Sequence, residues 1–171
     1  PYEYKGKTHY MDNNAIKVFE NGLKQYGGYT LGLYEEVRNT ENNFRVMHRK
    51  ETEDRVRNAL QQALANSCTG KIDVIGHSMG ATLAAQQIDK LAIASQVDSF
   101  VGIAGAFRGL LSCGVYPYNV WNSTCGSAGL SVSSPLLDSL YGTRFAQKVY
   151  SIKSYSDQVV CATGSCLVYG I

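Results

Sequence analysis

The residue with the clearest potential for chemistry is Ser78, at the centre of the pentapeptide Gly-His-Ser-Met-Gly over residues 76–80. The pentapeptide follows an apolar run over 72–75 and opens a segment with helical spacing, which predicts a sharp turn from a strand into a helix. Such a turn holds its serine in a strained backbone conformation, and the flanking glycines let the strand and the helix come close. Ser78 is therefore a candidate nucleophile, and the backbone N–H of Met79 a candidate donor to the oxyanion formed in acyl transfer.

Asp157 is the best candidate for the carboxylate that a serine nucleophile requires. A serine hydroxyl becomes reactive when an imidazole takes its proton, and a carboxylate holds that imidazole in the useful tautomer. Asp157 comes after the strand predicted over 149–152, whereas Asp98 begins a strand and Asp138 lies in a short predicted helix. The alternative role for Asp157 is a loop cap that accepts hydrogen bonds from nearby backbone amides.

The three histidines do not provide an assigned base. No histidine follows Asp157 in the sequence. His77 flanks the candidate nucleophile, and we expect its side chain to pack at the turn and to point away from the serine hydroxyl. His9 and His48 are expected at the surface.

Apolar spacing predicts an alternation of helices and strands that positions these residues. Helices are expected over 12–26, 51–67 and 79–91 and from Ser134 onward, and strands over 29–37, 72–75, 97–104 and 149–152. The alternation predicts an α/β fold, a mostly parallel sheet with helices on both faces, in a single domain over 1–171. Ligands of such sheets bind beyond the carboxyl ends of the strands, where Ser78 and Asp157 both fall.

The stretch 105–134 is expected to be a lid-like insertion without regular structure of its own. Its aromatic residues either wall an apolar acyl site or pack into a small core of the insertion. These residues are Phe107, Tyr116, Tyr118 and Trp121.

The composition is that of a globular protein, with 44% hydrophobic and 18% charged residues and a net charge of +2. That charge gives no argument for binding nucleic acid or an anionic membrane. No apolar run is long enough to span a bilayer, and the first residues do not read as a signal peptide, so the chain is interpreted as mature or trimmed. The scattered histidines do not match a metal site, and no cofactor is expected.

The five cysteines indicate an oxidising compartment, and hence a secreted protein. Cys113 and Cys125 bracket one short stretch and Cys161 and Cys166 another, so that a disulfide could close each of them. Cys68 is left over.

Several ordered segments resemble the secreted class 2 lipases and, more closely, the extracellular polyhydroxybutyrate depolymerases of the α/β-hydrolase superfamily. These segments are 73–80, 104–113, 125–127 and 157–163. The resemblance implies that Ser78 is the nucleophile and Asp157 the acid of a catalytic triad. It also implies hydrolysis of carboxylic esters through an acyl-enzyme, with an ester or lipid-like substrate and no cofactor.

The sequence departs from these families at both ends. Their members carry a strand with a His-Gly oxyanion loop before the helix expected here over 12–26, and a final strand with the catalytic histidine after the aspartate. We therefore expect that this chain is a piece of a longer polypeptide or one subunit. Missing segments or a second chain would then supply the oxyanion loop and the catalytic histidine. The isolated chain is expected to be inactive. The alternative is a non-catalytic binding or structural protein of the same fold, in which Ser78 is kept for turn geometry.

Overall fold

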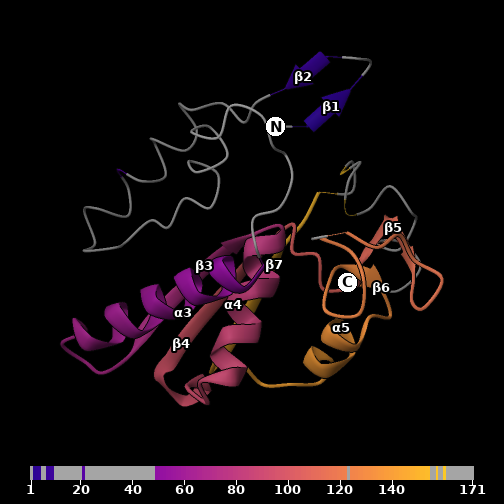
Figure 1. The fold of residues 1–171 in the computed structure, drawn as a ribbon. Helices are drawn as coiled ribbons and strands as arrows, with labels where there is room; N and C mark the ends of the chain where they lie inside the picture. Colours follow the sequence, from indigo (N-terminus) through magenta and orange to yellow (C-terminus); the bar gives the residue numbers. More distant parts are fainter. Residues whose placement is uncertain are drawn as a thin grey trace. The chain divides into compact units, whose positions relative to one another are not determined.

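A computed structural model describes residues 2–4, 7–9, 21, 49–122, 124–154, 157 and 160. The helix expected over 12–26 and the strand expected over 29–37 lie outside these residues, apart from residue 21, which is helical. The chain divides into two units, residues 1–32 and 33–171. In the first unit, β1 (Tyr2–Tyr4) pairs with β2 (Lys7–His9) as an antiparallel hairpin (Figure 1).

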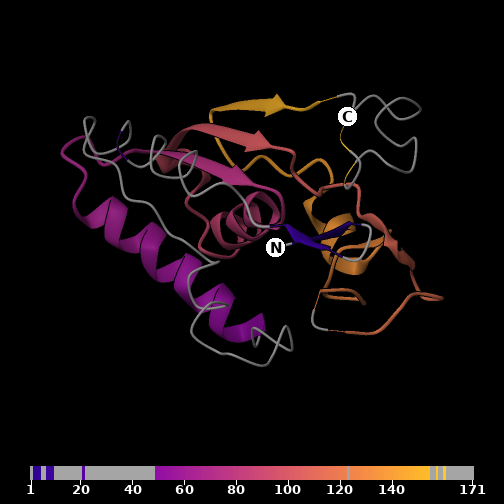
Figure 2. The same cartoon turned by 90° about the horizontal axis from the view of Figure 1, so that it is seen from above.

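The second unit is built around a parallel sheet with the strand order β3-β4-β7. The strands are β3 (Ile72–His77), β4 (Val97–Ile103) and β7 (Lys148–Ile152). Figure 2 shows the three arrows side by side and pointing the same way. The structure confirms the three strands predicted in this part of the chain and the parallel α/β class.

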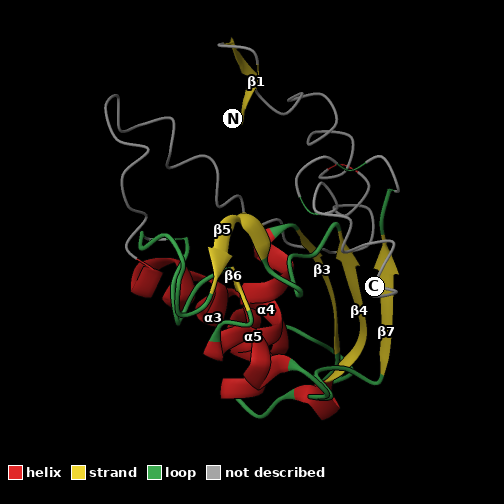
Figure 3. Ribbon diagram, turned by 90° about the vertical axis from the view of Figure 1, so that its right-hand side faces the viewer, coloured by secondary structure: helices red, strands yellow, loops and turns green. Residues whose placement is uncertain are grey.

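Two long helices cover one face of this sheet, α3 (Arg49–Ala65) and α4 (Met79–Lys90). Figure 3 shows both on the same side of the strands. Helix α3 contributes Val56 and Leu60 to the main core, which also contains Ala81 and Ile88 of α4 and Phe100 of β4. Small buried residues at the start of α4 let this helix lie close to the sheet.

The opposite face of the sheet is not covered by any helix that the structure describes. Side chains alternate between the two faces of a strand, so Gly76 faces α4, and Ile75 and His77 face away from it. Both of these side chains are exposed. Helices were expected on both faces of the sheet. Among the described residues, helices cover one face only.

Between β4 and β7 the chain leaves the sheet and forms an excursion with a small core of its own. It contains β5 (Leu110–Val115), β6 (Ser131–Val132) and the helix α5 (Pro135–Leu140). The expectation of an insertion without regular structure over 105–134 was wrong in this respect, since β5 and β6 form a parallel pair. The small core joins five buried residues, Ala106, Cys113, Cys125, Leu130 and Leu137.

Candidate functional site

Ser78 occupies the turn between β3 and α4 in a backbone conformation that is rare for a residue with a side chain, φ 52° and ψ −129°. A positive φ at a non-glycine residue costs roughly 1–3 kcal/mol and persists where the surrounding structure enforces it. Two hydrogen bonds do so here. The Ser78 N–H donates to the carbonyl of Ile103 at 2.9 Å, and the Ser78 carbonyl accepts from the N–H of Ala81 at 3.1 Å.

Ser78 is half-buried, so that part of the residue is accessible to solvent. Serine at the start of a helix usually accepts a hydrogen bond from the first turn through its hydroxyl oxygen. Among the described residues, the Ser78 hydroxyl makes no such capping bond to α4. The turn thus presents the hydroxyl without using it to stabilise the helix.

Gly76 allows the strand and the helix to approach as the sequence predicted. A Cβ atom at this position would lie 2.8 Å from the nitrogen of Ala81 and closer still to its Cα, which no real side chain tolerates. Gly80 differs, because a Cβ there would meet no atom of the described residues within 4 Å. The close approach expected of both glycines is therefore confirmed for Gly76 only.

Met79 is the first residue of α4, where backbone N–H groups have no acceptor within the helix. This is the position that the sequence predicted for an oxyanion donor. The Met79 side chain packs against both the main core and the small core of the excursion. The sequence analysis assigned no role to this side chain, because no periodic pattern in the sequence indicated that it would contact both cores.

Backbone hydrogen bonds continue across the carboxyl edge of the sheet beyond the strands themselves. Ala104, which also has a positive φ of 47°, donates its N–H to the carbonyl of Ile152 at 2.8 Å. The ends of β3, β4 and β7 are thereby held together, with about 10 Å from the first strand to the third. Asp157 follows the end of β7, and β7 ends at the same edge of the sheet as β3, the strand that precedes Ser78.

Asp157 caps its own loop. Its Oδ1 accepts a hydrogen bond from the N–H of Val160 at 2.9 Å, and its N–H donates to the carbonyl of Ser154 at 3.2 Å. Asp157 therefore has the loop-capping role that the sequence analysis gave as its alternative. A carboxylate has about four acceptor positions, so this bond does not prevent it from also orienting an imidazole.

The expectation that His77 packs at the turn was wrong. His77 ends β3, and its side chain is exposed, because its position in the strand points it away from α4. The side chains of His9 and His48 lie outside the described residues.

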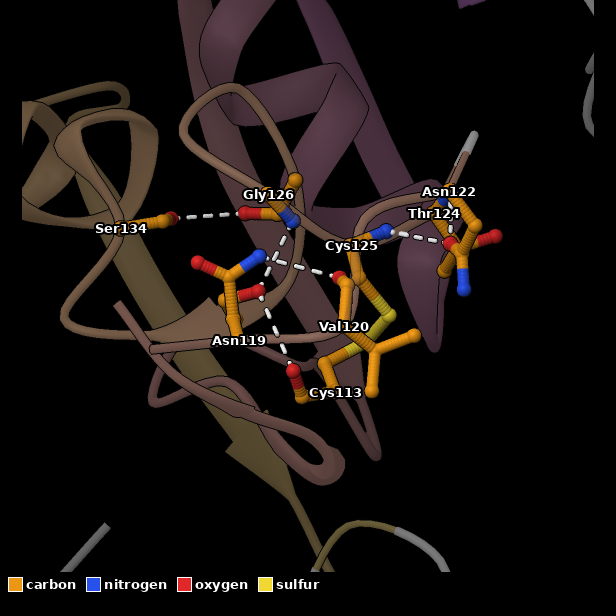
Figure 4. The surroundings of a disulfide bond; sticks show 10 residues. Cys113, Asn119, Val120, Asn122, Thr124, Cys125, Gly126 and Ser134 are labelled. Atoms are coloured by element: carbon orange, nitrogen blue, oxygen red, sulfur yellow. Dashed lines mark hydrogen bonds between the residues drawn. A yellow bond between two sulfur atoms is a disulfide. The ribbon is translucent and has the colours of Figure 1, made fainter. Parts of the chain in front are cut away.

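Cys113 and Cys125 form a disulfide with their Cα atoms 5.3 Å apart, which confirms one of the two expected pairings (Figure 4). Cys161 and Cys166 lie outside the described residues. Cys68 is free and exposed. Within the part of the chain that the structure describes, no three His, Cys, Asp or Glu residues are grouped as metal ligands.

The phenyl rings of the excursion and the sheet form a cluster in the main core. Phe107 stacks on Phe145 with ring centroids 5.8 Å apart and meets Phe100 edge-on at 6.3 Å. Phe107, which the sequence analysis placed either at an acyl site or in a core of the insertion, belongs instead to the main core. Tyr118 and Trp121 are exposed.

The parallel sheet, the covering helices and the strained serine turn define a protein of the α/β-hydrolase type. A model of the family Lipase (class 2) matches residues 13–167. No curated protein matches the chain. The chain belongs to the class 2 lipase family, and this membership supports the hydrolysis of esters, with an ester or lipid as the substrate.

The described helices include none that combines the length and apolar character needed to span a membrane. The closer resemblance to polyhydroxybutyrate depolymerases is not tested by the family match and stays a prediction.

Proposed function

We propose that this protein is a secreted serine hydrolase that cleaves carboxylic esters through an acyl-enzyme on Ser78. The observation that carries the proposal is the backbone of Ser78, whose φ of 52° is enforced by hydrogen bonds to Ile103 and Ala81. Strain of this kind persists at functional sites, where it sets the direction of a reactive group. A serine kept only to cap the helix would use its hydroxyl for that purpose.

In the proposed reaction, the Ser78 oxygen attacks the acyl carbon of the ester and an imidazole takes the hydroxyl proton. The N–H of Met79 donates to the oxyanion of the tetrahedral intermediate, and the imidazole then protonates the departing alcohol. Asp157 holds the imidazole in the tautomer that accepts the proton. Water then attacks the acyl carbon of the acyl-enzyme while the imidazole takes its proton, and the Ser78 oxygen leaves and receives a proton from the imidazole as the carboxylic acid is released.

The imidazole in this proposal comes from polypeptide outside residues 1–171 or from a partner chain. His77 is a poor candidate, because it lies on β3 next to Ser78 with its side chain on the face away from α4. A second donor to the oxyanion is assigned to the same external source. Activity assays therefore need the protein as its source produces it.

Secretion is supported by the disulfide between Cys113 and Cys125, since such bonds persist in oxidising compartments. The polyester specificity rests on the sequence resemblance alone. Release of soluble acids from suspended polyhydroxybutyrate, compared with release from a tributyrin emulsion, tests which ester is preferred.

The test of the proposed function is hydrolysis of a water-soluble short-chain p-nitrophenyl ester by the full protein and by two serine variants. Ser78→Ala should abolish turnover. Ser133→Ala is the matched control, because Ser133 is an exposed serine that also has a positive φ, 55°. Full activity in Ser78→Ala would contradict the proposal and favour the non-catalytic alternative.

A further inference from the structure

Asn122 is an exposed residue that the proposed reaction does not use. Of the ten asparagines in the chain, it alone stands two residues before a serine or threonine, in the tripeptide Asn122-Ser123-Thr124. This tripeptide, with no proline at its centre, is the acceptor sequence for N-linked glycosylation. A motif this short also arises by chance, so the case depends on how the fold presents the amide.

The asparagine lies on the solvent side of an anchored loop. Asn122 falls within the stretch that the Cys113–Cys125 disulfide closes, and both cysteines are buried in the small core. The two residues before it are exposed, with 57% of Val120 and 65% of Trp121 accessible to solvent. A bulky sugar attached at this point therefore extends into solvent and displaces no packed core.

The side-chain amide of Asn122 is oriented by hydrogen bonds to its oxygen. Oδ1 accepts from the N–H of Thr124 at 2.8 Å and from the N–H of Cys125 at 2.8 Å (Figure 4). Two N–H donors that face one atom identify this atom as the oxygen of the amide. Figure 4 shows Nδ2 on the side of the amide away from Cys125, and no described residue accepts a hydrogen bond from it.

Glycosylation changes only the atom that these bonds leave free. A sugar on Nδ2 replaces one of its two hydrogens, and the carbonyl oxygen of the amide remains an acceptor. The hydrogen bonds from Thr124 and Cys125, which form a turn typical of asparagine, therefore persist in the modified protein. The folded loop accommodates the glycan without rearrangement.

We propose that Asn122 is an N-glycosylation site and carries an oligosaccharide in the secreted protein. In the transfer reaction, Nδ2 attacks the anomeric carbon of an oligosaccharide held on a lipid diphosphate. The bond from that carbon to Nδ2 forms as its bond to the diphosphate oxygen breaks; the lipid diphosphate leaves with the bonding electrons, and Nδ2 loses one proton. The sugar donor belongs to the secretory route, so the site rests on the secretion included in the proposed function and is independent of catalysis by Ser78.

The experiment uses the full protein as its source produces it. The intact mass is measured before and after digestion with a peptide N-glycosidase in heavy-oxygen water, which leaves a labelled aspartate at each asparagine that carried a glycan. Digestion should remove mass from the protein and place label at position 122. Asn58 is the internal control, because it is also exposed but has Leu60 two residues later, and it should stay unlabelled.

Variants produced in the same source separate the modification from the turn. Thr124→Ala removes the hydroxyl that the acceptor sequence requires but keeps Asn122 and the backbone N–H, so the glycan should be lost. Thr124→Ser is the matched control and should keep the glycan. Asn122→Asp retains an oxygen for the two backbone hydrogen bonds but has no amide nitrogen, so it should fold with its disulfide intact and lack the glycan.

An unmodified Asn122 in the protein from its source, or a glycan that persists in Thr124→Ala, would overturn the proposal. The state of the cysteines then distinguishes two failures. Free thiols at Cys113 and Cys125 would contradict secretion as well, whereas an intact disulfide would leave secretion standing and remove only the glycan. Failure of catalysis is separate, since it appears as missing hydrolysis of a soluble ester by a protein that is glycosylated at Asn122.

Discussion

The N–H of Ser78 donates a hydrogen bond to the carbonyl of Ile103, 2.9 Å away, and this bond joins the turn after β3 to the end of β4. It extends the ladder of the parallel sheet by one step into a residue that is no longer in a strand. A corresponding hydrogen bond joins the ends of β4 and β7, where the N–H of Ala104 donates to the carbonyl of Ile152 at 2.8 Å. The direction of the Ser78 side chain is thus set by the sheet itself, which gives the turn a rigid foundation.

Gly76→Ala should destabilise the fold by about 1–3 kcal/mol, because its new Cβ would overlap the backbone of Ala81. Gly80→Ala is the matched control. The described residues leave open space beside Gly80 and it lies within α4, so alanine there should be neutral or stabilise by up to about 1 kcal/mol. Urea unfolding of both variants checks the pair. An equal loss of stability in the two would mean that the strand–helix contact at Gly76 is not a tight one.

Asp157→Asn separates the two roles of this residue. Asparagine keeps an oxygen that can accept the hydrogen bond from Val160, so the loop cap and the stability should persist. It cannot stabilise a charged imidazole, so turnover of a soluble ester should fall by about 10³–10⁴-fold. The control is Asp138→Asn in α5, which should leave turnover unchanged. If Asp157→Asn retained full turnover, Asp157 would be a loop cap only.

Removal of the disulfide by Cys113→Ala together with Cys125→Ala should cost about 2–4 kcal/mol of stability, because the unfolded chain regains the freedom of the closed loop. The loss should be seen as a lower midpoint in thermal unfolding. Cys68→Ala, at the free and exposed cysteine, should change the midpoint little. A disulfide-free variant as stable as the parent would show that the small core holds the excursion without it.

Ser134→Ala should destabilise the junction between the excursion and α5. The Ser134 hydroxyl accepts from the N–H of Leu137 at 3.3 Å and donates to the carbonyl of Gly129 at 2.7 Å, and the residue is buried. Loss of this cap should cost about 1–2 kcal/mol. Ser133→Ala, at the exposed neighbouring serine, serves as the control in the same denaturant titration. Equal midpoints for the two variants would contradict the capping role.

The local features of the fold were predictable because they depend on short-range patterns. The strand–turn–helix at Ser78 follows from an apolar run, two glycines and a helical repeat, and Ser134-Pro135 marks the start of a helix by the preference of each residue for its position. The Cys113–Cys125 pairing follows from a spacing that a disulfide can close. The Cys161–Cys166 pairing, the helix over 12–26 and the strand over 29–37 stay predictions.

The features that the sequence did not predict depend on contacts between distant segments. The pairing of β5 with β6 joins residues far apart in the chain, and Leu110–Val115 lacks the alternation that marks a strand. The exposure of His77 depends on which face of the sheet the helices cover, and a short apolar run does not specify that face. The position of Phe107 in the main core likewise depends on Phe145, which arrives much later in the chain.

The most direct test of the account is to treat the protein, as its source produces it, with a fluorophosphonate and to map the modified peptide by mass spectrometry. We predict one label, on Ser78, that disappears in Ser78→Ala and persists in Ser133→Ala. A protein that stays unlabelled, or that carries its label on another serine, would contradict the claim that the turn between β3 and α4 presents the nucleophile.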